Sequence, residues 1–259
     1  MGCKKESFNV ENLNGNRIDK MGHGGMGFSN LYPINSLESI LRCLNSGADG
    51  TEIDVQLTKD GVLVAFHDAN LSKSTNKNGI IQSMNWEDVK DAQYNNTHFS
   101  TYKIQSLENI FSAIPTQGEK TFTLDIKLYS EDNDQSSYFN NFTDAIVQFF
   151  DKHELSNHVY IESQDKNFLA LLQSKQPNYQ LYHYPQSYQE GIAVVEELGI
   201  KGISISTDII STEQIQEAHL KGIFITLWNV DSKKKNKEAI RKNPDMIQTD
   251  KVKHLSKLL

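Results

Sequence analysis

The sequence predicts a single TIM-type (β/α)8 barrel, an α/β fold, on three observations. The chain has 259 residues, close to the about 250 residues at which such barrels form one domain. Strand-like runs alternate with amphipathic helical patterns from Ile18 to the C-terminus, which is typical of parallel β-α-β units. Eight strand runs favour a closed barrel, and a doubly wound open sheet is the structural alternative.

The predicted strands are short runs bounded by polar or glycine-containing segments. They span residues 17–23, 50–57, 120–127, 158–163, 179–184, 202–206, 222–230 and 245–250. The number and spacing of these runs leave room for a helix between most of them, as parallel connections require.

The predicted helices carry apolar residues three and four positions apart. In SLESILRCLNSG the residues on this face are Leu37, Ile40, Leu41 and Leu44. Ser36 is a suitable N-cap and Gly47 a suitable end. Residues 136–154 and 187–200 show the same pattern, and the segment 211–222 opens with Ser-Thr caps and closes at glycine.

Composition and charge exclude some functions. The net charge is −7, and no basic stripe provides the clustered lysine and arginine that duplex nucleic acid requires. No apolar run is long enough to span a membrane, and no signal peptide is present. Cys43 lies in a helical pattern and is interpreted as a small core residue.

The N-terminal segment, residues 1–16, is polar and is predicted to be a tether ahead of one barrel domain over 17–259. Cys3 followed by a polar spacer resembles a bacterial lipoprotein, in which the cysteine would be lipidated and the protein held at the cell envelope. The alternative is a ragged terminus of a cytoplasmic protein. Within the domain, residues 58–105 form a predicted loop-rich elaboration.

Polar residues gather where the predicted strands end. In a parallel barrel the carboxyl ends of all strands lie on one rim, where function is expected. The residues at these ends are His23, Glu52, Asp54, Asp125, Lys127, Glu162, Ser163, His183, Ser204, Ser206, Trp228, Asn229, Thr249 and Asp250. Their convergence predicts a site. Glu162, His183 and Tyr184 are interpreted as ordinary rim residues.

The stretch EIDVQLTKDGVLVAFHD, residues 52–68, predicts a β-hairpin beyond the rim. The Asp-Gly pair at 60–61 is preferred in two-residue type I′ turns, and such a turn would place Asp54 directly opposite His67. Opposite residues point to the same face of a ladder. Glu52 shares that face because side chains alternate along a strand. The hairpin therefore predicts one cluster of two acids and a histidine.

Two carboxylates this close repel each other unless a cation lies between them. Ca²⁺ and Mg²⁺ take oxygen ligands, and Asp125 can supply a third carboxylate from the neighbouring strand. Zinc, which prefers nitrogen and sulfur, fits less well. The sequence predicts a Ca²⁺ or Mg²⁺ site at Glu52, Asp54 and Asp125, and surface ion pairs with lysines are the alternative.

His23 and His67 are candidates for proton transfer. On opposite sides of a metal-bound phosphodiester they would supply a general base and a general acid. Lys127 can contact a phosphate oxygen as a point charge. Glycines in HGGMG, from Gly24 on, let backbone N–H groups approach an anion.

These features resemble the glycerophosphodiester phosphodiesterase family along nearly the whole chain. The matching parts are His-x-Gly at 23–25, GADGTEIDVQLTKDGVLVAFHD at 47–68, LDIK at 124–127, Trp228 and PDMIQTD at 244–250. The second of these is long and specific, so chance similarity is improbable.

The resemblance implies a barrel that hydrolyses glycerophosphodiesters, small-molecule substrates, to an alcohol and glycerol 3-phosphate with a divalent metal. The implied metal ligands are Glu52, Asp54 and Asp125. The implied acid–base pair is His23 and His67. The implied substrate contacts are Lys127, Gly24 and Trp228. In the family mechanism the glycerol 2-hydroxyl attacks phosphorus, and water then opens the resulting cyclic phosphate.

The chain departs from the family pattern at three positions. Gly24 stands where arginine is usual, Ile34 where glutamate is usual, and Asp125 where glutamate is more frequent. We interpret the first two as a lost ion pair, because their joint loss leaves no orphaned charge. Loss of the arginine removes a bidentate phosphate contact, so either the other donors suffice or the substrate differs.

Two other functions are compatible with the sequence. A phospholipase D-like member of the superfamily would act on intact lipids, but it would need apolar loops, and residues 70–101 are polar. A degenerate barrel that binds phosphodiesters without turnover is favoured by the missing arginine and glutamate. The intact set of acids and histidines opposes it.

Overall fold

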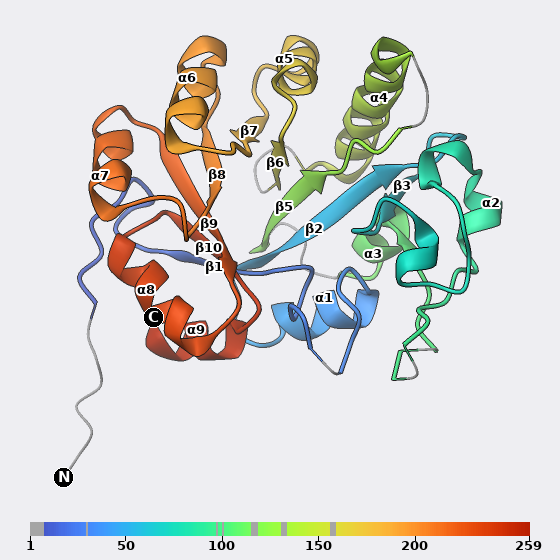
Figure 1. Ribbon diagram of the computed structural model, residues 1–259, viewed down its shortest axis with the longest axis horizontal. Coiled ribbons are helices and arrows are strands. Elements are labelled where there is room, and N and C mark those ends of the chain that lie inside the picture. The colour runs from blue at the N-terminus through green and yellow to red at the C-terminus, as the bar shows by residue number, and fades with distance from the viewer. Residues whose placement is uncertain are drawn as a thin grey trace.

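In a computed structural model, eight parallel strands close into a ring that helices surround, counted over the residues it describes (Figure 1). Those residues are 8–29, 31–96, 98–99, 101–114, 119–130, 134–155 and 159–259. The ring strands are β1 (Asp19–Gly22), β2 (Gly50–Leu57), β5 (Thr121–Ile126), β6 (Val159–Ser163), β7 (Gln180–His183), β8 (Gly202–Ser206), β9 (Phe224–Val230) and β10 (Met246–Thr249). β1 pairs with both β10 and β2. The predicted (β/α)8 barrel is confirmed, and the open sheet is excluded.

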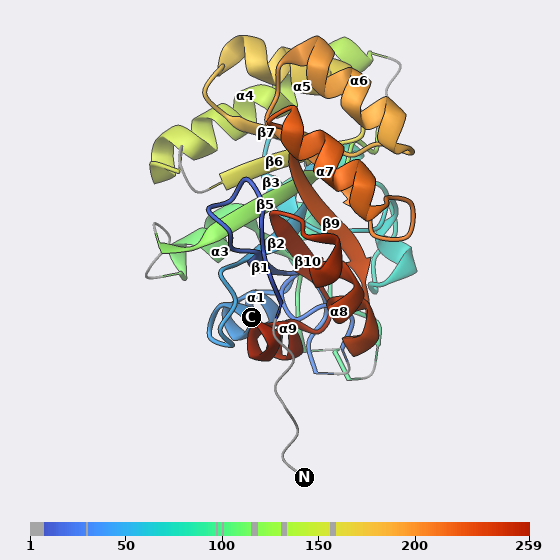
Figure 2. The same cartoon turned by 90° about the vertical axis from the view of Figure 1, so that its left-hand side faces the viewer.

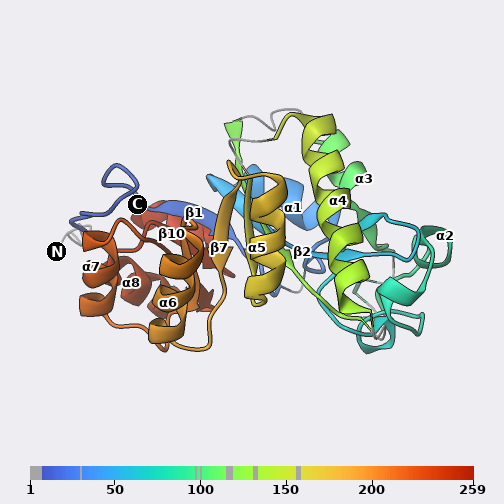
Figure 3. The ribbon, with the colours of Figure 1, turned by 90° about the horizontal axis from the view of Figure 1, so that it is seen from above.

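Helices follow the ring strands and cover the outside of the barrel. They are α1 (Leu37–Leu44), α3 (Leu107–Ser112), α4 (Gln135–His153), α5 (Lys166–Lys175), α6 (Tyr188–Leu198), α7 (Thr212–Leu220), α8 (Lys233–Lys242) and α9 (Val252–Leu258). Figure 2 shows α4 to α7 on one side of the strands and α1, α8 and α9 on the other. Figure 3 shows α7, α6, α5 and α4 following one another along the barrel.

Local capping sets the helix starts that the sequence predicts. The Ser36 hydroxyl accepts a hydrogen bond from the Ser39 N–H at the start of α1. Ser211 begins α7 in a capping box with Gln214. These caps satisfy N–H groups that a helix end leaves without partners.

The main hydrophobic core lies between the strands and the helices. Ile53 and Val55 of β2 pack outward in this core with rings such as Phe142 of α4. Burying each such side chain contributes roughly 1.5–3 kcal/mol. Because side chains alternate along a strand, Glu52 and Asp54 take the opposite face, toward the barrel interior. β2 therefore packs its apolar face in the outer core and directs its two acids toward the barrel interior.

The hairpin after β2 is confirmed, but its predicted register is wrong. β3 (Leu63–Ala65) pairs antiparallel with β2, with Val55 opposite Ala65. The Thr58 N–H donates to the Val62 carbonyl, so the loop has three residues, and Gly61 takes a φ of +86°. Three-residue hairpin loops use glycine in this way. Phe66, whose N–H donates to the Asp54 carbonyl, therefore takes the place that the two-residue turn would have given His67.

The elaboration after the hairpin has a small core of its own. It contains η1 (Leu71–Lys73), η2 (Ile81–Ser83), α2 (Trp86–Val89) and β4 (Gln105–Ser106), which pairs antiparallel with β3. Its buried side chains are Val64, Phe66, Leu71, Ile81, Val89, Ala92, Tyr94 and Ile104. Figure 1 shows it beside β3, outside the ring. The segment is polar in composition, yet it is built around an apolar centre.

Residues 8–16 lie against the barrel. Phe8 and Val10 pack against the main core, and the Asn12 side chain donates to the Pro244 carbonyl over 2.7 Å. The rest of the predicted tether, with Cys3, lies outside the described residues. Cys43 is fully buried, as predicted, and it is a free cysteine among the described residues. Among the described helices, none is both long enough and apolar enough to cross a bilayer.

Candidate active site

Three carboxylates from neighbouring strands meet inside the rim of the barrel. Asp54 of β2, Asp125 of β5 and Glu162 of β6 are partners in the parallel register, so they form one row across three strands. Glu52 lies two residues before Asp54 on β2, so its side chain also points into the barrel. Ligand oxygens of Glu52, Asp54 and Asp125 all lie within 4.8 Å of one another. The structure brings together the three acids that the sequence singles out.

Side-chain and backbone donors hold the acids of the cluster, and Lys127 is shared by two of them. The Asn35 side-chain amide donates to Asp54 Oδ2 over 2.7 Å, and the Asp54 N–H donates back to Asn35 Oδ1 over 3.0 Å. Lys127 Nζ lies 3.0 Å from Asp54 Oδ1 and 2.5 Å from Asp125 Oδ2. The Gly24 N–H donates to Glu52 Oε2 over 2.8 Å. Glu52 Oε1 is buried and has no hydrogen-bond partner among the described residues.

Burial dominates the electrostatics of this cluster. It raises the pKa of Glu52 well above its usual value, and the charges of Asp54 and Asp125 raise it further. Burial also raises the pKa of Asp125, which Lys127 offsets only in part. For Asp54, burial acts in the same direction, but the charges of Lys127, His67 and His23 outweigh it and lower the pKa. Glu52 is therefore the acid whose burial is least compensated by positive charge, because Lys127 lowers its pKa only slightly.

The cluster fits a hard divalent cation. Its donors are all carboxylate oxygens, which Ca²⁺ and Mg²⁺ prefer, and the unpartnered Glu52 Oε1 is buried beside the other two acids. Lys127 supplies one positive charge against three acids. A cation would supply the charge that burial of three acids requires.

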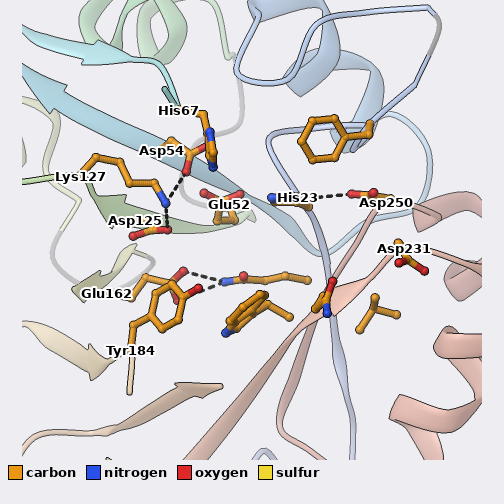
Figure 4. A pocket seen from close by; sticks show the side chains of 15 residues that line it. His23, Glu52, Asp54, His67, Asp125, Lys127, Glu162, Tyr184, Asp231 and Asp250 are labelled. Carbon is orange, nitrogen blue, oxygen red and sulfur yellow. Dashed lines mark hydrogen bonds and ion pairs between the residues drawn. The ribbon is translucent and has the colours of Figure 1, made fainter. Parts of the chain in front are cut away.

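Two histidines face the carboxylates from different elements (Figure 4). His23 follows β1, and its Nδ1 lies 2.7 Å from Asp250 Oδ1. His67 follows β3, and its Nδ1 lies 3.2 Å from Asp68 Oδ1. A carboxylate on Nδ1 fixes the ring and leaves Nε2 for the site. Burial works against the charged form of His23, but Asp250 outweighs it and raises the pKa.

A cavity of about 360 Å³ opens over this cluster. Besides the acids, both histidines and Lys127, its lining residues are Phe28, Glu162, Tyr184, Trp228, Asn229, Val230, Asp231, Gln248 and Asp250. The Trp228 ring packs edge-on against Tyr184 at a centroid distance of 4.9 Å. Its Nε1 is buried and has no hydrogen-bond partner among the described residues.

The glycine loop after β1 does not offer free donors to a substrate, which corrects the expectation for Gly24. The N–H groups of Gly24, Gly25 and Met26 donate to Glu52, Thr51 and Ser39 within the protein. Gly24 is also not among the described residues that line the cavity.

The two departures at 24 and 34 lie side by side. A Cβ built on Gly24 would stand 2.8 Å from the Ile34 Cβ. This adjacency is what a lost ion pair between the two positions requires. Gly24 also has a φ of +51°, a left-handed conformation that favours glycine.

Sequence reasoning missed three residues of the site. Asp250 was seen only as a strand end, although closure of the ring between β1 and β10 places it beside His23. Asn35, which follows the departure at Ile34, is not assigned by the sequence pattern, although its side chain exchanges two hydrogen bonds with Asp54. Glu162 was interpreted as an ordinary rim residue, yet it is buried in the cavity wall, and burial raises its pKa to about 8. Strand register identifies it, and no local signal does.

Tyr184 also lines the cavity, contrary to its interpretation as an ordinary rim residue. His183, by contrast, is buried beside the cavity wall, where its Nδ1 lies 3.2 Å from the Ser163 carbonyl. It is not among the described residues that line the cavity.

Comparisons with known proteins find relatives over most of the chain. The family model described as "Glycerophosphoryl diester phosphodiesterase family" matches residues 26–254. A glycerophosphodiester phosphodiesterase of Bacillus altitudinis is 26% identical over 236 residues, covering 86% of this chain and 91% of that protein.

Solved structures share the fold. A putative glycerophosphodiester phosphodiesterase from Galdieria sulphuraria has a TM-score of 0.80 at 21% identity, covering 93% of this chain and 98% of that one. An Oleispira antarctica phosphodiesterase, in complex with the product sn-glycerol-3-phosphate, has a TM-score of 0.79 at 19% identity, covering 93% and 96%.

Proposed function

Because the chain belongs to the glycerophosphoryl diester phosphodiesterase family, we propose that it hydrolyses glycerophosphodiesters to an alcohol and glycerol 3-phosphate. One observation carries the proposal. A three-carboxylate cluster and two carboxylate-oriented histidines face a single cavity of about 360 Å³. This set of groups matches hydrolysis of a phosphodiester, which needs charge neutralisation at phosphate and two proton transfers.

We assign Glu52, Asp54 and Asp125 as ligands of a Ca²⁺ or Mg²⁺ ion. Such an ion, when bound, would stabilise the negative charge that develops on the phosphate oxygens. Lys127 is held between Asp54 and Asp125, and we expect its ammonium to contact an oxygen of the same phosphate. Trp228 lines the same cavity, which supports a contact between its ring and the substrate.

The two histidines differ in a way that assigns their roles. Asp250 lies closer to His23 than Asp68 lies to His67 and raises the pKa of His23. His23 is therefore the general acid, which protonates the leaving alcohol oxygen as its bond to phosphorus breaks. His67 is the general base, which removes a proton from the glycerol 2-hydroxyl as this group attacks phosphorus. Water then completes hydrolysis, so the diester and one water give the alcohol and glycerol 3-phosphate.

The first test is release of glycerol 3-phosphate from glycerophosphocholine. We expect release with Mg²⁺ or Ca²⁺, loss of release in EDTA, and recovery when the metal is restored. Asp54→Asn should lose turnover, whereas Asp91→Asn, which removes an exposed acid of the elaboration, should retain it. Binding without metal-dependent release under any of these conditions would identify a non-catalytic binding barrel.

The second test separates the histidines by leaving group. A p-nitrophenyl ester of glycerol phosphate releases a weakly basic phenolate that needs little protonation, unlike choline. His23→Ala should therefore lower kcat/KM for the choline ester about 10²–10⁴-fold and for the nitrophenyl ester much less. His67→Ala should impair both substrates alike. Equal losses for the two esters in His23→Ala would refute its assignment as the acid.

A further inference from the structure

Strand β9 carries one residue more than β10 where it passes the cavity. Leu227 pairs with Ile247 of β10, whereas Val230 pairs with Thr249. Two residues of β9 therefore lie between these pairs, and only one residue of β10 does. Such an extra residue is a β-bulge, a feature that occurs beside active sites and re-aims side chains. We call residues 228–229 the bulge.

The bulge contributes two consecutive side chains to the cavity. Trp228 and Asn229 both line it, although consecutive side chains of a regular strand point to opposite faces. Leu227 and Val230, on either side of the bulge, both pack in the main hydrophobic core. The extra residue therefore adds Asn229 to a wall that regular alternation would leave to Trp228.

Asn229 has an unusual backbone conformation. Its φ is +61°, in the left-handed region that is costly for residues with a Cβ and that asparagine enters more readily than most of them. In the strands that the structure describes, no other residue except glycine has such a φ. A conformation of this kind persists only where neighbouring groups hold it in place.

Two charged side chains supply the contacts that hold Asn229. Its side-chain amide donates to Asp208 Oδ2 over 2.6 Å. The Lys235 ammonium donates to the Asn229 carbonyl over 3.1 Å and to the same Asp208 oxygen over 3.2 Å. Asp208 follows β8, and Lys235 lies in α8. These two residues, the Asp208–Lys235 pair, therefore fix Asn229 by both its side chain and its backbone.

The Asp208–Lys235 pair lies outside the cavity. Neither residue is among the described residues that line it, and the Asp208 side chain is 51% exposed. The loop that carries Asp208 also holds the other residue of the bulge, because the Thr207 N–H donates to the Trp228 carbonyl over 3.0 Å. Both residues of the bulge are thus attached to the segment after β8.

Resting on the proposed function, we propose that Asp208 and Lys235 are positioning residues. They hold the bulge in its left-handed conformation and thereby place the Trp228 ring for contact with a bound glycerophosphodiester. Without them Asn229 can relax toward the extended backbone of a regular strand, which displaces the neighbouring ring. The three acids and two histidines of the site come from other elements and stay in place. The pair therefore governs substrate binding more than turnover of bound substrate.

The first test measures hydrolysis of glycerophosphocholine by the metal-loaded protein. Asp208→Ala should raise KM about tenfold, the scale of one aromatic contact, and leave kcat within about threefold, as loss of ground-state binding does. Asp208→Asn keeps an acceptor oxygen for the Asn229 amide and should restore most of the KM. Asp144→Ala removes a comparably exposed ion pair, with Lys175 on the outer helices, and should leave KM unchanged.

The second test observes the Trp228 ring directly and needs no turnover. Trp86→Phe leaves Trp228 as the only tryptophan of the chain. In this background, without metal or substrate, Asp208→Ala should shift the tryptophan emission to longer wavelength and increase its quenching by acrylamide, because a displaced ring is more exposed to water. Asp208→Asn and Asp144→Ala should give the emission of the parent.

Lys235→Met removes the ammonium and keeps an unbranched side chain, so it should raise KM and shift the emission in the same way if Asp208→Ala does not fold. Three outcomes would overturn the proposal: unchanged KM and emission in both variants of the pair, equal changes in Asp144→Ala, or a fall in kcat at constant KM. Failure of the proposed function is distinguishable from these. In that case the parent itself would release no glycerol 3-phosphate, while the emission of Trp228 would still report on the ring.

Discussion

Both ends of the barrel contain buried acids, but the number of hydrogen-bond donors around these acids differs between the two ends. Asp245, just before β10 at the amino-terminal end, accepts hydrogen bonds from the N–H groups of Leu13 and Ile225 over 2.9 and 2.8 Å. His219 Nε2 lies 3.0 Å from the same carboxylate. Glu52, near the carboxyl-terminal end, accepts one hydrogen bond, from Gly24, and its other oxygen has none among the described residues.

This difference separates stability from function. A buried carboxylate with three donors holds the chain together, because each donor offsets part of the cost of removing the charge from water. A buried carboxylate without enough donors, beside two other acids, destabilises the fold unless something positive binds. The carboxylate at the amino-terminal end is therefore satisfied by folding alone. The carboxylate at the carboxyl-terminal end is satisfied only when a positively charged ligand binds.

The largest effect on activity is expected when the charge of Glu52, at the carboxyl-terminal end, is removed. Glu52→Gln should lower kcat/KM on the order of 10³-fold, as loss of a transition-state charge group does. In EDTA the same variant should unfold at a higher temperature than the parent. The raised pKa of Glu52 means that the folded state keeps this proton to higher pH than the unfolded state does, and this lowers stability above the unfolded-state pKa. Activity assays and thermal unfolding measure the two effects. A lower unfolding temperature of the variant in EDTA would contradict the inference that burial of Glu52 destabilises the metal-free protein.

Asp245→Asn is the matched change at the amino-terminal end, where the carboxylate has three donors. It should lower the free energy of unfolding by about 3 kcal/mol, because it breaks a buried, charge-assisted network. Turnover per folded molecule should stay within about twofold of the parent, since Asp245 lies at the opposite end of the strands from the cavity. Urea denaturation with an activity assay measures both, and a large loss of turnover in the folded protein would erase the distinction between the ends.

A smaller effect concerns pH and Glu162. The pKa of this carboxyl is raised to about 8, chiefly by burial, so between about 4.3 and 8 the unfolded state loses a proton that the folded state keeps. Stability contributed by this group therefore falls as pH rises through that window. In EDTA, Glu162→Gln should gain about 2 kcal/mol over the parent between pH 4.5 and 6, at about 1.4 kcal/mol per unit. Denaturation at both pH values tests this, and a constant difference would show that Glu162 ionises normally.

Local pattern predicted much of the fold. The periodicity of apolar residues located the ring strands and four of the helices, α1, α4, α6 and α7, within a few residues, and the Ser36 and Ser211 caps mark the starts of α1 and α7. The alternation in β2 correctly placed Glu52 and Asp54 on one face. The turn residues did not distinguish a two-residue from a three-residue hairpin loop, so Asp54 was paired with His67 in place of Phe66.

Sequence by itself determined which side chains face inward, because that depends only on neighbours along one strand. Tertiary structure alone decided which inward side chains meet. The register across β2, β5 and β6 put Asp54, Asp125 and Glu162 in one row, and closure of the ring paired His23 with Asp250. A second cavity, between the loop after β1 and the elaboration, likewise joins residues far apart in the chain. Such pairings come from packing between distant segments, which leaves no periodic signal in a single sequence.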